Sequence, residues 1–264
     1  MWSDYFSYVE TIGSRYFMIA GIAFVLFYFL LGGLMGRKKL QPKNPGLDDY
    51  AREIGYSVIT IAIFALVPLL ILHVPFIARY TTYYTRIDTH GWFYFFLAFP
   101  LMFLIHDTYF YWTHRLMHHK KLFKVFHLVH HKSTNPSPWA AYAFHPLEAV
   151  VEAGVFVVFM FTIPIHFLHL FIFFFLMIVY NVYGHLGYEL YPHGFNKTWI
   201  GKWINTSTSH NQHHQYFKGN YGLYFTFWDR IMGTIRKDYD QRFEEVTTKR
   251  KKEQEHEAND LLLL

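Results

Sequence analysis

Residues 149–183 read AVVEAGVFVVFMFTIPIHFLHLFIFFFLMIVYNVY, and Glu152 is their only Asp, Glu, Lys or Arg. Pro164 lies near the middle of this apolar run. Proline removes a backbone donor and clashes with the preceding turn, so one continuous helix through the whole run is disfavoured. We therefore expect two apolar helices that form a hairpin with its apex at this proline. An apolar run of this length is typical of a chain whose solvent is a lipid bilayer.

Three further apolar segments precede the hairpin, at residues 16–35, 56–78 and 92–105. The first two are long enough to cross a hydrocarbon core, which takes about 20 residues. The third is long enough if its helix continues through Trp112. No basic leader precedes the first segment, so we expect it to stay in the mature protein. With 53% hydrophobic and 22% aromatic residues, the chain is expected to be an all-α, multi-pass membrane protein with about four transmembrane helices, including the helical hairpin.

The organisation of the chain favours one catalytic unit, because no flexible linker or internal repeat divides it. We place N-terminal transmembrane helices at residues 1–104, the catalytic region at 105–240 and a charged C-terminal tail at 241–264. The absence of cysteine excludes disulfides, thiolate nucleophiles and cysteine-bound clusters. The formal net charge is only +5, and the basic residues lie beside apolar runs, which indicates lipid headgroups rather than nucleic acid as partners.

The basic residues also predict the orientation in the membrane. Arg37, Lys38, Lys39 and Lys43 directly follow the first span, so this loop should face the cytoplasm. Counting the later spans forward then places all the histidine-rich segments on the same side, as a cytosolic helical cap with the active site facing the cytoplasm. With no evident retrieval tail, a bacterial inner membrane is favoured, with the endoplasmic reticulum as the alternative.

The spacing of the 18 histidines indicates which chemistry the chain supports. One pair is separated by four residues, and a His-x-x-His-His motif occurs at residues 127–131 and again at 210–214. Residues three and four apart share a helix face, so each motif can aim its imidazoles at one point. Histidines at a headgroup interface are the alternative interpretation, but clustered neutral imidazoles are typical of metal ligation. His185, at the end of the returning hairpin arm, is a further candidate. The predicted ligands are His114, His118, His127, His130, His131, His185, His210, His213 and His214.

The other histidines receive different interpretations. His106 and His145 lie close to the motifs, and whether they also bind metal stays open. His119 shares no helix face with His114 and His118 and is excluded. The remaining six are expected in interfacial, loop or surface roles: His73, His90, His166, His169, His193 and His256.

Nine imidazoles exceed what one metal ion accepts, so the pattern indicates two ions. The His-Glu-x-x-His signature of zinc proteases is absent, and nitrogen ligands with open positions suit iron and O2. Four nearby carboxylates are expected to hold imidazole tautomers, with helix capping or a surface position as the alternative for each. They are Asp107, Glu148, Glu189 and Asp229.

Four motifs lie in order between residues 105 and 234: His106-Asp-Thr-Tyr-Phe-Tyr-Trp-Thr-His114-Arg-Leu-Met-His118, His127-Leu-Val-His130-His131-Lys, His145-Pro-Leu-Glu148, and His210-Asn-Gln-His213-His214 followed by Gly219-Asn220-Tyr221-Gly222 and Phe227-Trp-Asp229-Arg-Ile-Met-Gly233-Thr234. In this combination they resemble the fatty acid hydroxylase and sterol desaturase superfamily of integral-membrane histidine-box di-iron oxygenases. Some members of that superfamily carry a His-x-x-x-His pair in the returning arm, where this chain has Asn181 and His185.

The resemblance implies an O2-dependent enzyme with two iron ions that hydroxylates or desaturates a membrane lipid such as a sterol, a fatty acyl chain or another isoprenoid or alkyl lipid. The three histidine boxes would be the ligands, with no catalytic residue beyond them. The residues contain no flavin or dinucleotide motif, so electrons are expected from an external donor, either cytochrome b5-like or a ferredoxin with its reductase.

Two other classes stay open: a zinc-dependent membrane hydrolase and a non-catalytic metal-binding membrane protein. A transporter would place ionisable residues along a path through the membrane, whereas the apolar segments here are almost free of charge. Metal content and dependence on O2 would separate an oxygenase from a hydrolase.

Overall fold

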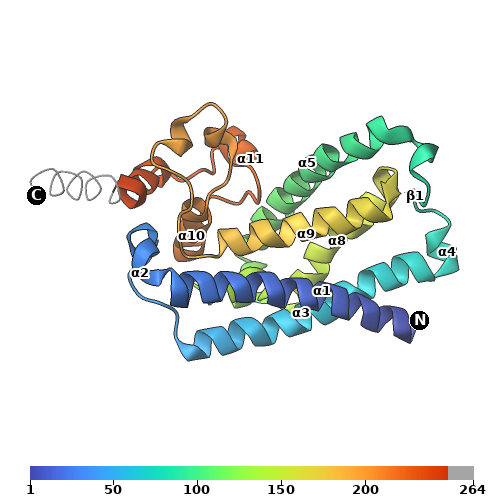
Figure 1. The fold of residues 1–264 in the computed structure, drawn as a ribbon, viewed down its shortest axis with the longest axis horizontal. Helices are drawn as coiled ribbons and strands as arrows, with labels where there is room; N and C mark the ends of the chain where they lie inside the picture. Colours follow the sequence, from blue (N-terminus) through green and yellow to red (C-terminus); the bar gives the residue numbers. More distant parts are fainter. Residues whose placement is uncertain (249–264) are drawn as a thin grey trace, which may run out of the picture.

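The computed structural model describes residues 1–248, so the greater part of the predicted charged tail, including His256, lies outside the described residues. The described chain is mostly helical, which confirms the all-α class. Four of its helices are long and apolar enough to span a membrane: Trp2–Leu30, Leu47–His73, Gly91–Met117 and Phe167–Gly184. The predicted multi-pass membrane architecture is therefore confirmed (Figure 1).

The first span comprises α1 (Trp2–Phe24) and the π-helical η1 (Val25–Leu30). It begins well before residue 16, because the polar residues Asp4, Glu10 and Arg15 are accommodated within a helix that apolar neighbours continue on both sides. The second span, α3 (Leu47–His73), packs along α1. The third, α5 (Gly91–Met117), does continue past Trp112, as its length requires for crossing the bilayer.

The hairpin consists of α8 (Pro146–Thr162) and α9 (Phe167–Gly184), and Pro164 lies in the turn between them as predicted. Next to this turn, β1 (Tyr83–Tyr84) pairs in parallel with β2 (Ile165–His166), with Tyr83 opposite Ile165. This short pairing ties the hairpin apex to the loop between α3 and α5. α8 packs against α3 and α5, and α9 against α1 and α5, so the hairpin fills the centre of the bundle.

Short helices form a cap at the other end of the long helices (Figure 1). One of them, η4 (Pro138–Tyr142), packs against α1, where Tyr16 stacks on Tyr142 with ring centroids 5.3 Å apart and donates a hydrogen bond to the carbonyl of Trp139 at 2.8 Å. The other cap helices are α6 (Phe123–Phe126), α7 (Leu128–His131), η5 (Phe195–Lys197), η6 (Gly201–Trp203), α10 (Ser207–Tyr216) and α11 (Phe227–Ile231). Connecting turns are α2 (Gly32–Met35), η2 (Gly36–Lys38), α4 (Pro75–Ala78) and η3 (Ile87–Thr89).

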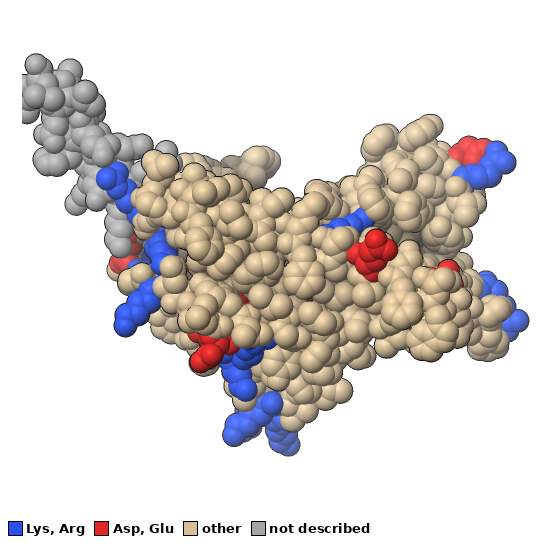
Figure 2. All heavy atoms as spheres, turned by 60° about the horizontal axis from the view of Figure 1, so that its bottom comes forward, with Lys and Arg blue, Asp and Glu red and all other residues tan. Residues whose placement is uncertain are grey.

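The surface agrees with a membrane environment. Figure 2 shows Lys and Arg mainly around the edge of the face in view, with a broad, largely uncharged area between them. Large apolar side chains such as Phe17, Leu70 and Phe96 are exposed on the spanning helices. Exposed apolar area of this extent is expected where lipid, rather than water, covers the protein.

Candidate metal centre

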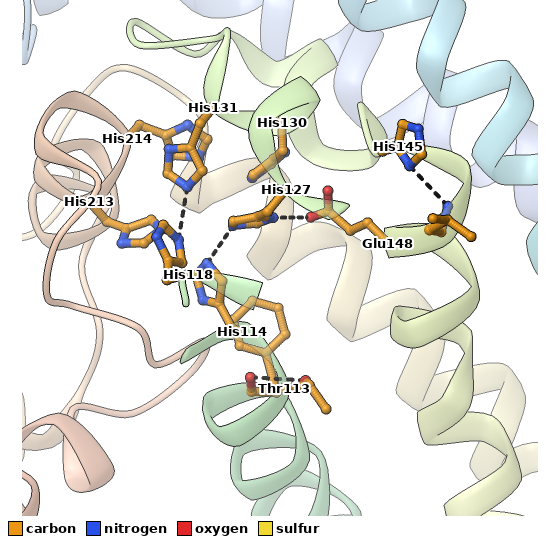
Figure 3. Close-up of polar contacts among 12 residues, drawn as sticks. Thr113, His114, His118, His127, His130, His131, His145, Glu148, His213 and His214 are labelled. Carbon is orange, nitrogen blue, oxygen red and sulfur yellow. Dashed lines mark hydrogen bonds and ion pairs between the residues drawn. The ribbon is translucent and has the colours of Figure 1, made fainter. Parts of the chain in front are cut away.

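All nine predicted ligands meet in the cap as two adjacent groups of buried or half-buried imidazoles. The five-histidine group contains His114, His118, His127, His131 and His213, and the four-histidine group contains His130, His185, His210 and His214. Within each group the candidate ligand nitrogens lie within 4.8 Å of one another. Figure 3 shows the side chains from α5, from the α6–α7 segment and from α10 converging, and those it labels are His114, His118, His127, His130, His131, His213 and His214.

Each His-x-x-His-His motif contributes to both groups, which differs from the expectation that each motif aims at a single point. His127 and His131, four residues apart, belong to the five-histidine group, while His130 belongs to the other. In α10, His210 and His214 belong to the four-histidine group, while His213 belongs to the five-histidine group. Positions four apart differ by about 40° around a helix, whereas adjacent positions differ by about 100°. The motif thus lies between the two groups.

Backbone carbonyls orient four of the imidazoles. In each case the Nδ1 atom lies opposite an oxygen that can only accept, so Nδ1 carries the proton and Nε2 is left with a free lone pair. The pairs are His114 with Tyr221 (2.9 Å), His185 with Asn181 (2.8 Å), His213 with Gly219 (2.8 Å) and His214 with Ser133 (2.9 Å).

The free Nε2 atoms then face one another. In the four-histidine group, Nε2 of His185 lies 3.1 Å from Nε2 of His214. In the five-histidine group, Nε2 of His114 lies 2.9 Å from Nε2 of His127, whose Nδ1 is paired with Glu148 Oε1 at 2.6 Å. Two lone pairs at such distances repel each other unless a cation lies between them. This geometry therefore fits bound metal rather than a hydrogen-bonded histidine network.

The spacing also matches the dimensions of a metal site. With metal–nitrogen distances of about 2.1 Å, neighbouring ligand nitrogens are about 3.0–3.4 Å apart in octahedral or tetrahedral geometry. Seven of the Nε2–Nε2 pairs within the two groups are 2.9 to 3.4 Å apart. The residues present therefore fit two metal ions, one in each group.

Burial keeps these imidazoles neutral, which is the form that binds metal. Desolvation, together with repulsion between neighbouring imidazolium charges, lowers the pKa of seven histidines well below the usual value. These are His118, His127, His130, His131, His210, His213 and His214. Burial also lowers the pKa of His185 to about 4.

Of the four predicted carboxylate partners, only Glu148 contacts an imidazole within residues 1–248, that of His127. The other three bind backbone instead. Asp229 accepts hydrogen bonds from the backbone N–H groups of Tyr221 and Gly222 at 3.0 and 2.7 Å, and Asp107 accepts from those of Tyr224 and Phe225. These contacts fix the loop whose carbonyls orient His114 and His213. Glu189 accepts from the backbone N–H and the hydroxyl of Thr208 at 3.0 and 2.7 Å, which holds the start of α10.

Replacing Asp229 with Ala is therefore expected to destabilise the protein and weaken metal binding together. Each buried backbone N–H left without an acceptor costs about 1–3 kcal/mol, and the released loop would no longer hold the two imidazoles. Thermal unfolding and metal content of the purified variant measure both effects. Asp88→Ala, at an exposed ion pair with Arg86, is the control. Metal content equal to that of the wild type in Asp229→Ala would contradict this role.

The structure also shows where the histidines lie that were not predicted to be metal ligands. His106 is buried and pairs through Nδ1 with the hydroxyl of Tyr224 at 3.0 Å, and His145 caps α8; neither belongs to a candidate metal group among the described residues. His119 is exposed. His166 and His169 lie at the hairpin apex as expected, but a surface position is wrong for both. Both are buried in the hairpin turn, where they cap α9.

Sequence reasoning missed the carbonyl acceptors, although the motif Gly219-Asn220-Tyr221-Gly222 marks their position. Gly219 has φ +82° and Asn220 has φ 55°. This left-handed backbone turns the carbonyls of Gly219 and Tyr221 toward the imidazoles of His213 and His114. A Cβ at Gly222 would clash with the carbonyl oxygen of Phe225. The glycines are therefore required by the turn that orients the ligands.

A cavity of about 280 Å³ leads from the two groups into the helical bundle. Its walls include the apolar side chains of Phe64, Phe156, Phe174 and Met177, and Tyr8 near the start of α1 lines its far end. The histidines that line it are His106, His114, His127, His130, His185 and His210. The candidate metal centre therefore closes one end of a mostly apolar, membrane-embedded cavity.

Comparison with known proteins agrees with this geometry. The family model for fatty acid hydroxylase matches residues 99–234. The chain is 37% identical over 154 residues to the Delta(7)-sterol 5(6)-desaturase ERG3B of Gibberella zeae, covering 58% of this chain and 46% of that protein. It is 30% identical over 243 residues to the Delta(7)-sterol 5(6)-desaturase erg3A of Aspergillus fumigatus, covering 88% and 65%. It is 30% identical over 194 residues to the lathosterol oxidase of Rattus norvegicus, covering 72% and 62%.

The chain thus spans less than two thirds of the length of each of these relatives. No solved structure matches it significantly. The fold and the site define a multi-pass membrane protein with a histidine-built candidate metal centre at the end of an apolar cavity. The chain belongs to the fatty acid hydroxylase family, and its relatives place it within the fatty acid hydroxylase and sterol desaturase superfamily.

Proposed function

We propose that the protein is an oxidoreductase that uses two iron ions and O2 to hydroxylate or desaturate a membrane lipid. The observation that carries this proposal is the pair of buried imidazole groups, with free Nε2 lone pairs facing one another, at the end of an apolar cavity. The family match and the sterol desaturases and lathosterol oxidase among the relatives support a lipid as the substrate.

The five-histidine and four-histidine groups would each hold one iron ion, which supplies the redox chemistry that activates O2. The protein's own residues orient the ligands, position the lipid and exclude water. Carbonyl acceptors fix the tautomers of His114, His185, His213 and His214, and Glu148 fixes that of His127. A fixed set of imidazoles needs little reorganisation when metal binds.

The cavity would position the lipid. Aromatic and aliphatic walls exclude water around the reacting carbon, which limits loss of the oxidant to side reactions. Because the cavity reaches from the histidine groups toward the far side of the bundle, an elongated lipid fits along α9 with the carbon to be oxidised beside His114 and His185. In this proposal the catalytic region is residues 105–240, and the N-terminal helices complete the wall of the cavity.

We also propose that the cap faces the cytoplasm, because the basic loop at residues 37–43 lies at the same end of the bundle as the cap. Electrons would come from a separate donor protein. Lys120, Lys121 and Lys124 are exposed and lie in the sequence between His118 and His127, and their positive charge would suit a donor with an acidic docking surface. The relatives reported above come from fungi and a mammal, so they do not support the expectation of a bacterial inner membrane.

The experiment that tests this function supplies the purified, iron-loaded protein with a reduced electron donor, O2 and either a Delta(7)-sterol or a fatty acyl lipid. We expect a product that has gained one oxygen atom or lost two hydrogen atoms, formed only when O2 is present. Parallel reactions without O2, or after iron removal by a chelator, should give no product. A lipid product that forms equally well without O2 would overturn the proposal.

A further inference from the structure

Glu152 is a buried carboxyl group in the cavity wall that the proposed chemistry does not use. It lies on α8, is 9% exposed and lines the cavity. Within residues 1–248, the carboxyl group of Glu152 has no hydrogen-bond or ion-pair partner. A carboxyl group in an apolar environment without a partner is costly, whether it is charged or neutral. Such a residue is expected to find its partner in a ligand.

The other buried glutamates among the described residues each have at least one partner in the protein, although Oε1 of Glu53 and Oε2 of Glu148 accept no hydrogen bond. Glu53 on α3 accepts a hydrogen bond from the hydroxyl of Ser137, and Glu189 accepts several from the segment around Thr208. Glu148 is paired with His127. The lack of a partner therefore distinguishes Glu152 from carboxylates that stabilise the fold.

Its position relative to Glu148 limits what Glu152 can contact. Glu152 follows Glu148 by four residues on the same face of α8, so it lies about 6 Å further along the helix axis. Glu148 reaches the imidazole of His127, whereas Glu152 lies one turn deeper, beside Val155 and Phe156 in the cavity wall. Glu152 thus faces the molecule that fills the cavity rather than the metal ions that the histidines would bind.

We propose that Glu152 binds a hydroxyl group of the lipid substrate and so selects lipids whose hydroxyl lies roughly one helical turn from the carbon that is oxidised. This proposal rests on the proposed lipid oxidation. A hydroxyl group both donates and accepts, so it satisfies the carboxyl group in either protonation state. A rigid polycyclic alcohol can present a hydroxyl at this distance, whereas an unsubstituted acyl chain lying along the cavity walls presents none there.

The test compares a Delta(7)-sterol with its deoxy analogue, in which hydrogen replaces the hydroxyl group. Binding to the purified protein and kcat/KM are measured for the wild type, Glu152→Leu and Glu152→Gln, with Glu10→Gln at an exposed position of α1 as the control. The wild type and the control should prefer the hydroxylated sterol by roughly tenfold or more. Glu152→Leu should lose the preference through a higher KM with unchanged metal content, and Glu152→Gln should keep part of it.

The outcomes separate this inference from the proposed function. Binding is also measured without metal, so it is informative even if no lipid is oxidised. A wild type that binds both sterols equally would overturn the role of Glu152, as would a Glu152→Leu variant that keeps the full preference. A wild type that prefers the hydroxylated sterol in binding but oxidises neither would contradict the proposed function alone. If Glu152→Leu does not fold, loss of preference in Glu152→Gln relative to the control decides the question.

Discussion

The His213→Ala variant is expected to lose the metal ion of the five-histidine group and all measurable lipid oxidation. His213 is fully buried, its Nδ1 is held by the carbonyl of Gly219, and its Nε2 lies 3.1 Å from that of His118. Alanine removes one ligand and leaves a void that no neighbouring side chain fills. Metal content should fall by about one ion per chain, because the four-histidine group does not include His213.

Two comparisons make this result specific. His214→Ala should remove the ion of the other group, although the two residues are adjacent in sequence. His119→Ala should change neither metal content nor activity, because His119 is exposed and lies outside both groups. Full metal retention in His213→Ala, with the protein still folded in detergent, would remove His213 from the ligand set.

The second large effect is expected for Glu148→Ala. Glu148 is 1% exposed and is paired through Oε1 with Nδ1 of His127, so its removal frees that imidazole to rotate and to change tautomer. Loss of such an orienting partner typically lowers metal affinity by about 10–100-fold. A titration of the metal-free protein with iron(II) against a competing chelator measures the change.

Glu148→Gln should keep most of the affinity, since the amide oxygen still accepts a hydrogen bond from His127. Glu10→Ala, at an exposed position of α1, should bind metal like the wild type. Equal affinity in Glu148→Ala and the wild type would show that the tautomer of His127 is fixed without Glu148.

The sequence alone allowed prediction of the membrane spans and of the histidines that converge. Apolar runs of sufficient length have few alternatives to helices in a bilayer, and Pro164 marks the hairpin turn. Spacings of three and four residues selected eight of the nine histidines that the structure brings together. His185 could be included because the hairpin returns it to the side where the other motifs lie.

The division of these histidines into two groups could not be predicted, because it depends on where α5, α7 and α10 meet rather than on any one helix. The backbone carbonyls that accept hydrogen bonds from the histidines could not be predicted either, because every residue has a carbonyl. Helix α10 is polar throughout, yet Ser207 to His214 are all buried. Apolar periodicity finds no buried face in such a segment. Glu152 was part of an apolar run, and only the cavity shows that its carboxyl group lacks a partner.

Elemental analysis of the full chain, purified in detergent after expression with iron and without chelators, tests whether the histidine groups hold two iron ions. We expect about two iron ions per chain, held by the two histidine groups. Zinc alone that persists after reconstitution with iron would contradict the proposed iron centre, and no bound metal at all would show that the converging histidines are not ligands.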